Sequence, residues 1–543
     1  MKSAVRRARE ETGEGSGRTA ALQYLIGRNV SMRINVHLNR PARKQINFWN
    51  HIHFHPTDAI EDRWGQRILG RIERDHAAKM IRMHTMFEDM VTRGADGALK
   101  YDFSDTDARI DYLTAHGFEL LLCFDFMPVC MASDPLTNFS GVRYKNKRFN
   151  RSAPKDYAEW EEVCRVYTRH LIDRYGEERV SKWYFHCWNE PDGGFWINVK
   201  NNDTMDADGD MDKIEEYFKL YDYFEKGVTA VTRRVKLGGP SCAGSDRFMR
   251  LFLDHALNGT SAATGKRLKF DFVSVHCYSQ GIYSALPNKT YVSPDNIMQR
   301  LHTVHEMLTK AGAPDLEIFF DEWGMAGGGF IGIDRDPRML FRETEFFPAF
   351  YARLIDKIIK APELNLQHMM ICLSGQHECK KDFDGYRTFF TLNGFAKPIY
   401  NGYALAAKLG DKYLDNDAPD DPLMGLIPTM DESGRVAVMA YRHYDEFYKT
   451  CGNDNLTLRF DGLKGRYTLR HWRIDAQSCN AYKKWLELGS PVMPDFSQRE
   501  IIDEAAALKE YVPDETIEAD GSYALTVTMT QNAVSLIELI PVK

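Results

Sequence analysis

The chain has 543 residues, of which 43% are hydrophobic and 27% charged, a composition that excludes disordered and fibrous proteins. Its length allows a barrel of about 250 to 400 residues and at least one further domain. The formal net charge of -7 is small and no Lys/Arg stripe is present, so we expect no nucleic-acid partner. No segment approaches about 18 uninterrupted apolar residues, so we expect no membrane partner either.

The ten cysteines show no CxxC pair or regular spacing, which favours reduced, buried thiols over a secreted disulfide scaffold. The N-terminus has basic residues but lacks the apolar core of a signal peptide. It also contains Glu10, Glu11 and Glu14, which a transit peptide would avoid. We therefore expect a cytoplasmic protein, with residues 1–30 as a loosely held arm. The sequence does not distinguish a monomer from a homo-oligomer.

Next along the chain, residues 31–45 begin with an alternating segment, MRINVHLN, which is typical of a half-buried strand. Residues 46–410 then alternate between strand and helix patterns. The helical patterns include 64–76, 105–116, 157–174, 211–234 and 346–359. The eight candidate strands are 46–55, 80–87, 118–128, 182–191, 235–241, 271–279, 316–324 and 368–375. This order predicts an α/β fold, a closed (β/α)8 TIM barrel.

The pattern changes in residues 411–543. Short alternating runs at 435–442, 455–460, 465–472 and 523–539 are separated by Asp and Gly turns. Such runs predict a C-terminal β-sandwich domain. Because the strand in residues 31–45 lies before the barrel and needs a partner, we expect it to join this sandwich.

Two candidate barrel strands end on a carboxylate. The stretch WYFHCWNEPD delivers Glu190, and LEIFFDEWG delivers Glu322. Active sites of TIM barrels lie at the C-terminal ends of the strands, and two carboxylates flanking a bond are the standard requirement for glycoside hydrolysis. A single glutamate at a strand end would most often be a surface residue, but the matched pair favours a catalytic site.

These stretches resemble glycoside hydrolase family 39, the β-xylosidase and α-L-iduronidase family of the large (β/α)8 glycosidase clan. The likeness continues through FW at 48–49, IRMH at 81–84, FMP at 126–128, GGP at 238–240 and SVHCY at 274–278. The resemblance implies a retaining hydrolase that acts on non-reducing-end, β-xyloside-like glycosides by double displacement. Glu190 would be the acid/base and Glu322 the nucleophile. The implied partner is a carbohydrate substrate, and no cofactor or metal is expected.

The remaining site candidates surround this pair. The resemblance implies that Asn189 binds the sugar 2-hydroxyl. Tyr278 is placed to hydrogen-bond Glu322, and His276 shares its face of the sixth strand. Arg82 would hold Asn189 or Glu322, or else form an ordinary buried ion pair. The other substrate-binding candidates are His53, His55, His84 and Trp323, with His84 alternatively a structural histidine.

The sequence also departs from the family pattern. The eighth strand reads HMMICLSGQHE, with Ile371 or a neighbour where a tryptophan is usual, and Asp125 stands where a glycine is expected. The identity of the sugar is therefore left open. His51, His53 and His55 on the first strand support a rival hypothesis, a metal-dependent TIM-barrel hydrolase in which His186 and His276 complete the ligand set. A non-catalytic carbohydrate-binding relative is a third hypothesis.

Overall fold

The computed structural model describes residues 30–53, 60, 63–140, 148–197, 211–280, 292–329, 331–373 and 379–542. Eight parallel strands close into a barrel in the order β10-β11-β12-β3-β4-β7-β8-β9. The strands are β3 (His51–His53), β4 (Met80–His84), β7 (Glu119–Phe124), β8 (Tyr184–Cys187), β9 (Lys236–Cys242), β10 (Phe272–Gln280), β11 (Glu317–Ala326) and β12 (Leu366–Cys372). Each overlaps a strand predicted from the sequence, so the TIM-barrel prediction is confirmed.

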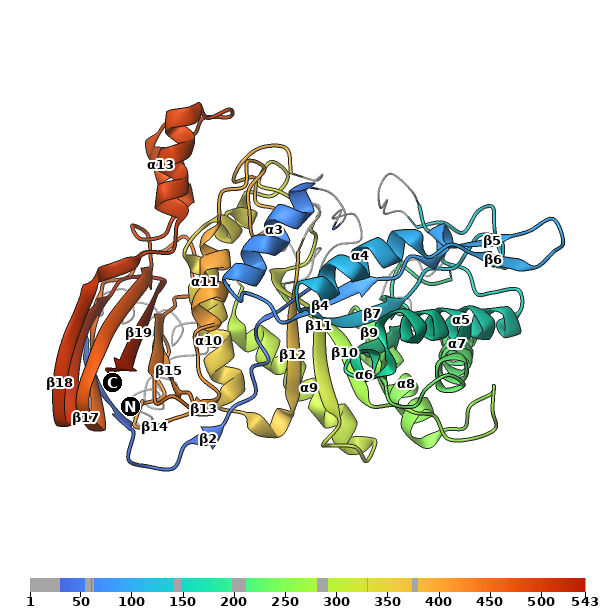
Figure 1. Ribbon diagram of the computed structural model, residues 1–543, viewed down its shortest axis with the longest axis horizontal. Helices are drawn as coiled ribbons and strands as arrows, with labels where there is room; N and C mark the ends of the chain where they lie inside the picture. Colours follow the sequence, from blue (N-terminus) through green and yellow to red (C-terminus); the bar gives the residue numbers. More distant parts are fainter. Residues whose placement is uncertain are drawn as a thin grey trace, which may run out of the picture.

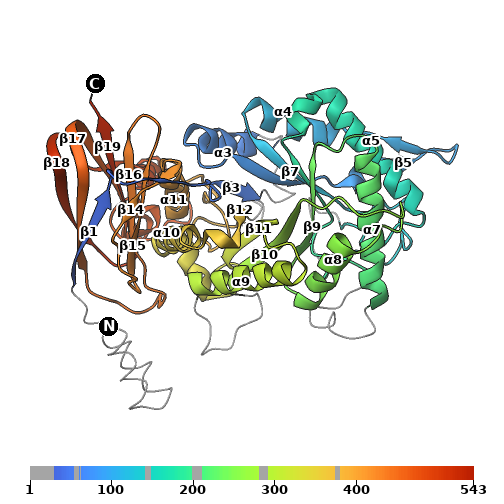
Figure 2. The ribbon, with the colours of Figure 1, turned by 90° about the horizontal axis from the view of Figure 1, so that it is seen from below.

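Helices surround the barrel, as Figures 1 and 2 show. They are α3 (Arg63–Arg74), α4 (Ser104–Ala115), α5 (Tyr157–Tyr175), α6 (Glu177–Val180), α7 (Met211–Thr229), α8 (Asp246–Asn258), α9 (Pro294–Lys310), α10 (Phe346–Ile359) and α11 (Pro398–Ala406). Several helices begin at an N-cap residue. The side chains of Asp156, Ser245 and Ser293 each accept a hydrogen bond from a backbone N–H of the first turn. Short 3-10 turns lie at η1 (Phe87–Asp89), η4 (Pro337–Glu343) and η5 (Pro362–Leu364), and a hairpin at β5 (Val91–Arg93) and β6 (Leu99–Tyr101).

The C-terminal part forms a mostly antiparallel sheet beside the barrel. Its nine strands are β1 (Ser31–His37), β2 (Arg43–Lys44), β13 (Lys412–Tyr413), β14 (Asp415–Asn416), β15 (Met424–Met430), β16 (Val436–Arg442), β17 (Asp454–Ile474), β18 (Glu510–Met529) and β19 (Ala533–Pro541). The N-terminal strand β1 pairs in parallel with β17, so the start of the described chain does join the C-terminal domain.

This sheet differs in detail from the sequence prediction. The runs 455–460 and 465–472 belong to one strand, β17. Its pairing with β18 is irregular between Asp461 and Lys464, but the strand does not end there. The run 523–539 is instead two strands, separated by a turn at Asn532, whose φ is 54°. All nine strands belong to one hydrogen-bonded sheet around a single apolar cluster.

Helix α10 connects the two parts of the molecule, since it packs on the barrel side and also contacts β15, β16 and β19. Between β17 and β18 the chain forms α12 (Ala481–Glu487) and α13 (Phe496–Ala506), and Figure 1 shows α13 projecting from the sheet. Among the described residues, no helix has the length and apolar character needed to span a membrane.

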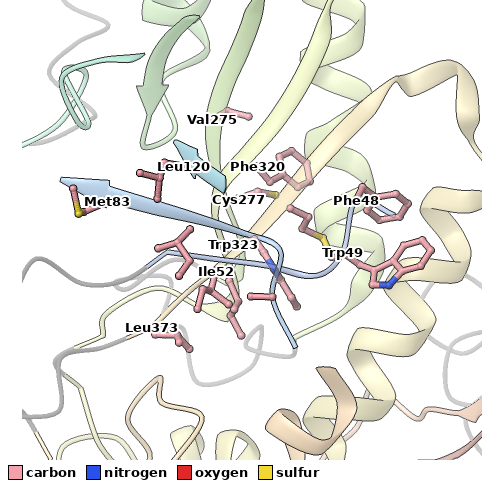
Figure 3. Packing of buried hydrophobic residues seen from close by; sticks show 14 of the residues in the cluster. Phe48, Trp49, Ile52, Met83, Leu120, Val275, Cys277, Phe320, Trp323 and Leu373 are labelled. Atoms are coloured by element: carbon pink, nitrogen blue, oxygen red, sulfur yellow. The ribbon is translucent and has the colours of Figure 1, made fainter. Parts of the chain in front are cut away.

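The barrel interior is filled in layers. The lower layer is apolar and consists of Met80, Leu121, Phe272, Phe319 and Met370. Strand residues that face outward pack instead against the helices, and Figure 3 shows Ile52, Phe320 and Trp323 in this outer cluster. Above the apolar layer, polar side chains from the same strands converge toward the C-terminal ends. This upper layer contains the candidate site.

Candidate active site

Glu190 and Glu322 meet at the C-terminal mouth of the barrel. One carboxylate oxygen from each lies within 4.8 Å of the other and of a ring nitrogen of His276. Glu190 lies three residues beyond the end of β8. Its backbone is in the left-handed conformation, with φ at 45°, and its N–H donates to the carbonyl of Ser241 at 3.0 Å. The backbone of Glu190 is thus fixed by the neighbouring strand β9, which aims its side chain over the barrel.

Two strand irregularities bring extra polar groups into this layer. The pairing of β9 with β10 skips Ser241, and the pairing of β10 with β11 skips Asp321. An extra residue in a strand re-aims the neighbouring side chains. As a result the consecutive carboxylates Asp321 and Glu322 both reach the barrel interior, where strict alternation would turn one of them outward.

Donors and positive charges surround Glu322. Its Oε1 accepts from Arg82 Nη1 at 2.8 Å and lies 3.3 Å from His53 Nδ1, while its Oε2 accepts from the Tyr278 hydroxyl at 2.8 Å. Arg387 in turn donates to the Tyr278 oxygen at 2.6 Å. Burial would raise the pKa of Glu322, but His276, His53 and Arg82 outweigh it and hold that pKa well below its usual range.

Glu190 has a different environment. Its side chain is 21% exposed, and its Oε1 lies 2.7 Å from His276 Nδ1. Burial raises the pKa of Glu190, and the contact with His276 opposes that rise only in part. The pKa of His276 is raised to about 9, because Glu322, Asp321 and Glu190 outweigh the effect of its burial. The two glutamates are thus pushed toward opposite protonation states.

Arg82 is the hub of the hydrogen bonds around Glu322. Besides its contact with Glu322, its Nη2 donates to Asn189 Oδ1 at 2.6 Å and to Ser241 Oγ at 3.0 Å, and its Nε donates to His186 Nε2 at 3.2 Å. From the sequence we expected Arg82 to hold Asn189 or Glu322, and in the structure Arg82 contacts both. The side-chain nitrogen of Asn189 takes no part in its hydrogen bond with Arg82.

His84 lies at the end of β4 and is 1% exposed. Its Nδ1 is hydrogen-bonded to Asp125, whose carboxylate also accepts from Cys123 Sγ at 2.9 Å. The ring of His84 lies 5.1 Å from that of His53 and stacks on Phe126. The unexpected Asp125 therefore orients His84 toward the same layer as Glu322.

One predicted site residue is misplaced. Trp323 was expected to contact sugar, but it is fully buried and stacks on Tyr351 of α10, with ring centroids 5.7 Å apart. Adjacent strand residues face opposite sides, and because Glu322 points inward, Trp323 points to the helices. Ile371, at the position of the missing tryptophan, is 3% exposed in the same outer cluster. His55 lies outside the described residues.

In the part of the chain that the structure describes, three groups of side chains have the spacing of metal ligands. They are His53, His84 and Glu322; His84, Cys123 and Asp125; and Glu190, His276 and Glu322. The guanidinium of Arg82 lies 3.3 Å from His53 Nδ1 and 2.8 Å from Glu322 Oε1, so a permanent cation already stands beside the first group. The raised pKa of His276 disfavours the unprotonated ring nitrogen that a metal would need in the third group. The arrangement favours acid/base chemistry over metal binding.

Sequence reasoning missed three residues of this layer. Ser241 follows the GGP motif, Asp321 precedes Glu322, and Arg387 lies beyond the eighth strand. The first two reach the site because of the strand irregularities, which no periodicity reveals. Arg387 is placed by a loop that is far from the other residues in sequence, and no local motif marks it.

The comparisons with known proteins agree on one family of enzymes. A model of glycosyl hydrolases family 39 matches residues 32–523. The chain is 26% identical to a β-xylosidase from Caldicellulosiruptor saccharolyticus over 496 residues, covering 89% of this chain and 93% of the relative. It is 27% identical to an α-L-iduronidase from Mus musculus over 286 residues, covering 49% of this chain and 40% of the relative.

A solved structure shows the same fold. The monomeric β-xylosidase from Caulobacter crescentus CB15 matches with a TM-score of 0.76 at 23% identity, covering 94% of this chain and 100% of that chain. The likeness therefore spans the barrel and the C-terminal sheet together.

Proposed function

The chain belongs to glycosyl hydrolases family 39 and is a glycosidase, and from this premise we propose that it is a retaining enzyme in which Glu322 is the nucleophile and Glu190 the acid/base. The observation that carries the proposal is the pair of carboxylates within 4.8 Å, one with a depressed and one with a raised pKa. Double displacement requires one ionised and one protonated carboxyl group at the start of the reaction.

In the first step, Glu322 attacks the anomeric carbon while Glu190 gives its proton to the leaving oxygen. The bond from the anomeric carbon to that oxygen breaks, and a glycosyl ester forms on Glu322. Glu190, now a carboxylate, then takes a proton from water as the water attacks the anomeric carbon. The bond from that carbon to Glu322 breaks, so the free sugar leaves, Glu322 is again a carboxylate and Glu190 is again protonated. Arg82 and Tyr278 hold Glu322 in the attacking position, since both hydrogen-bond its oxygens.

The spacing of the two glutamates supports retention. Retaining glycosidases have carboxyl groups about 5 to 5.5 Å apart, whereas inverting ones leave about 6.5 to 9.5 Å for a water molecule. One oxygen atom of Glu190 and one of Glu322 lie within 4.8 Å of each other, a short separation that supports the retaining arrangement. The same residues therefore favour a covalent intermediate.

For the substrate, we propose a non-reducing-end, β-xyloside-like glycoside. Glu322, Asn189 and His84 are each less than 10% exposed, which suits a single terminal sugar in a deep pocket. In this proposal Asn189 binds the 2-hydroxyl, while His53 and His84 bind other hydroxyls, and His276 and Tyr278 act on the two glutamates. The similarity to a β-xylosidase over most of both chains supports the choice of sugar.

The test is turnover of a panel of aryl glycosides that covers xylose, arabinose, glucose, galactose and uronic acids in both anomeric forms, with and without chelator. We expect hydrolysis of the β-xyloside or a close analogue, unchanged by the chelator. Activity lost on chelation and restored by metal would instead support the metal-dependent hydrolase. Failure to turn over the whole panel would support a non-catalytic carbohydrate-binding protein.

We further propose that the protein works in the cytoplasm. All ten cysteines carry free thiols in the structure, which suits a reducing compartment. Fractionation of the source cells would test this, since activity in the extracellular fraction would contradict it.

A further inference from the structure

Beneath His276 lies a group of buried polar residues that the reaction described above does not use. Ser241 Oγ lies 2.9 Å from His276 Nε2 and 2.6 Å from Asp321 Oδ2. Asp321 is fully buried, and neither residue touches the space where a sugar would lie above Glu322. We propose that Asp321, acting through Ser241, is a positioning residue that fixes the tautomer and charge of His276, and thereby the pH at which the Glu190–His276 pair loses its proton.

The direction of each hydrogen bond follows from the groups involved. Arg82 Nη2, 3.0 Å from Ser241 Oγ, can only donate, and the Asp321 carboxylate can only accept. The single proton of the Ser241 hydroxyl must therefore point to Asp321. The serine oxygen then has only lone pairs left for His276, so His276 Nε2 must carry a proton.

This forced tautomer determines what His276 offers to Glu190. With a proton fixed on Nε2, the titrating nitrogen is Nδ1, which faces Glu190 Oε1 at 2.7 Å and Glu322 Oε2 at 3.5 Å. When Nδ1 is protonated it donates to Glu190, and when it is bare it accepts the proton of the Glu190 carboxylic acid. Glu190 and His276 thus titrate as a coupled pair.

Of the described carboxylates around His276, Asp321 is the one that takes no part in the proposed bond changes. The charged and titratable neighbours on the packed elements are Glu190 and His186 at β8, Arg82 on β4, His53 on β3, and Asp321 and Glu322 on β11. Glu190 gives up its proton during turnover, and Glu322 becomes a neutral ester. His186 is held neutral, because burial and Arg82 lower its pKa well below the usual value.

Asp321 therefore takes no part in the proposed bond changes, whereas its two glutamate neighbours do. Its Oδ2 lies 3.8 Å from His276 Nε2 and 3.4 Å from Arg82 Nε. In the glycosyl-enzyme, where Glu322 is esterified, Asp321 still balances these two cations in the barrel interior. The two strand irregularities that skip Ser241 and Asp321 are what bring both groups beneath His276.

The inference rests on the proposed roles of Glu190 and Glu322, and its test uses two readouts that separate the two claims. The first is the pH profile of kcat/KM for the full chain and for Asp321→Asn, with the aryl glycoside that is turned over. A negative charge beside the pair favours its protonated form, so the asparagine variant should lose activity on the alkaline side about one to three pH units earlier. Asp356→Asn, a buried carboxylate on α10 with no contact to His276, should leave the profile unchanged.

The second readout is the nitrogen chemical shift of His276 in protein labelled with ¹⁵N-histidine, which needs no turnover. Wild type should show Nε2 protonated over the whole pH range. In Asp321→Leu, which has a similar size but no acceptor, the Ser241 hydroxyl loses its carboxylate partner and turns to His276, so the proton of the neutral ring should move to Nδ1. Ser241→Ala, which keeps the buried charge and already has a Cβ at its φ of 59°, should shift the alkaline limb in the same direction but less.

An unchanged tautomer and an unchanged alkaline limb in a folded Asp321 or Ser241 variant would overturn the inference, even if glycosidase activity is present. A tautomer change in a protein that never turns over a glycoside would instead support the inference about Asp321 and contradict the proposed reaction. If neither Asp321 variant folds, the same two measurements on Ser241→Ala decide the question.

Discussion

Glu190 and Glu322 are the same residue type at the ends of two barrel strands, yet their surroundings differ. Glu322 accepts hydrogen bonds from Arg82 and Tyr278 and lies beside two histidines. Among the described side chains, the carboxylate of Glu190 is hydrogen-bonded to His276. The pKa of Glu322 is depressed and that of Glu190 is raised. The comparison shows that side chains from other strands of the barrel, more than the glutamates' own strands, set the two environments.

Replacement of Glu322, the proposed nucleophile, should have the largest effect. In Glu322→Gln no ester can form, so kcat should fall by about 10⁴-fold or more for every substrate, whatever its leaving group. The measurement is steady-state turnover of an aryl glycoside. The matched control is Glu317→Gln, at the start of the same strand β11 and paired with Lys236, which should retain activity. Substantial turnover by Glu322→Gln would remove this residue from the chemistry.

The effect of replacing Glu190, the proposed acid/base, should depend on the leaving group. Glu190→Ala should lose about 10²- to 10⁴-fold with a poorly activated leaving group, because protonation then limits the first step. With a highly activated phenol that step needs no proton and should survive, and added azide should restore the second step. If both kinds of substrate lose activity equally, Glu190 and Glu322 do not differ in the way that their surroundings indicate.

Replacement of Arg82 should have the next largest effect. Arg82→Lys keeps the charge but loses the planar fork that reaches Glu322, Asn189 and Ser241 at once. We expect about a 10²-fold loss in kcat/KM and a lower Tm, since each buried acceptor left without a donor costs about 1 to 3 kcal/mol. Arg93→Lys, an exposed arginine paired with Glu159, is the control. Equal effects of the two substitutions would contradict the hub role of Arg82.

Removal of one hydrogen bond should give the smallest effect. Tyr278→Phe takes a donor from the ionised form of Glu322, so the pKa of Glu322 should rise and activity on the acid side should begin to fall at a higher pH than in wild type. The loss at the optimum should be about 10-fold, the equivalent of one hydrogen bond to a charged group. Tyr448→Phe, at an exposed position, should show neither change. An acid limb that stays in place would show that Tyr278 does not set this pKa.

The sequence was most informative where periodicity and position agree. Apolar strands followed by helices identified the barrel, and the strand ends identified Glu190 and Glu322. It was less informative about residues whose direction depends on strand irregularities. Asp321 and Ser241 reach the interior because one residue is skipped in each pairing. Trp323 was expected in the site, but the alternation that turns Glu322 inward turns Trp323 toward α10.

Long-range contacts formed the other part that the sequence did not predict. Arg387 reaches Tyr278 from a loop 109 residues further along the chain. That loop is held by buried pairs such as Lys397 with Glu343, whose nitrogen and oxygen lie 2.6 Å apart. Such placement depends on the packed fold and leaves no local motif.

The central claim, double displacement by Glu322 and Glu190, is tested most directly by the anomeric configuration of the product when it first forms. Proton NMR of an aryl glycoside hydrolysis, recorded before the free sugar equilibrates, distinguishes the two anomers. The account predicts that the first-formed sugar has the same anomeric configuration as the substrate. A first-formed sugar of the opposite configuration would show a single displacement by water and would contradict the nucleophilic role of Glu322.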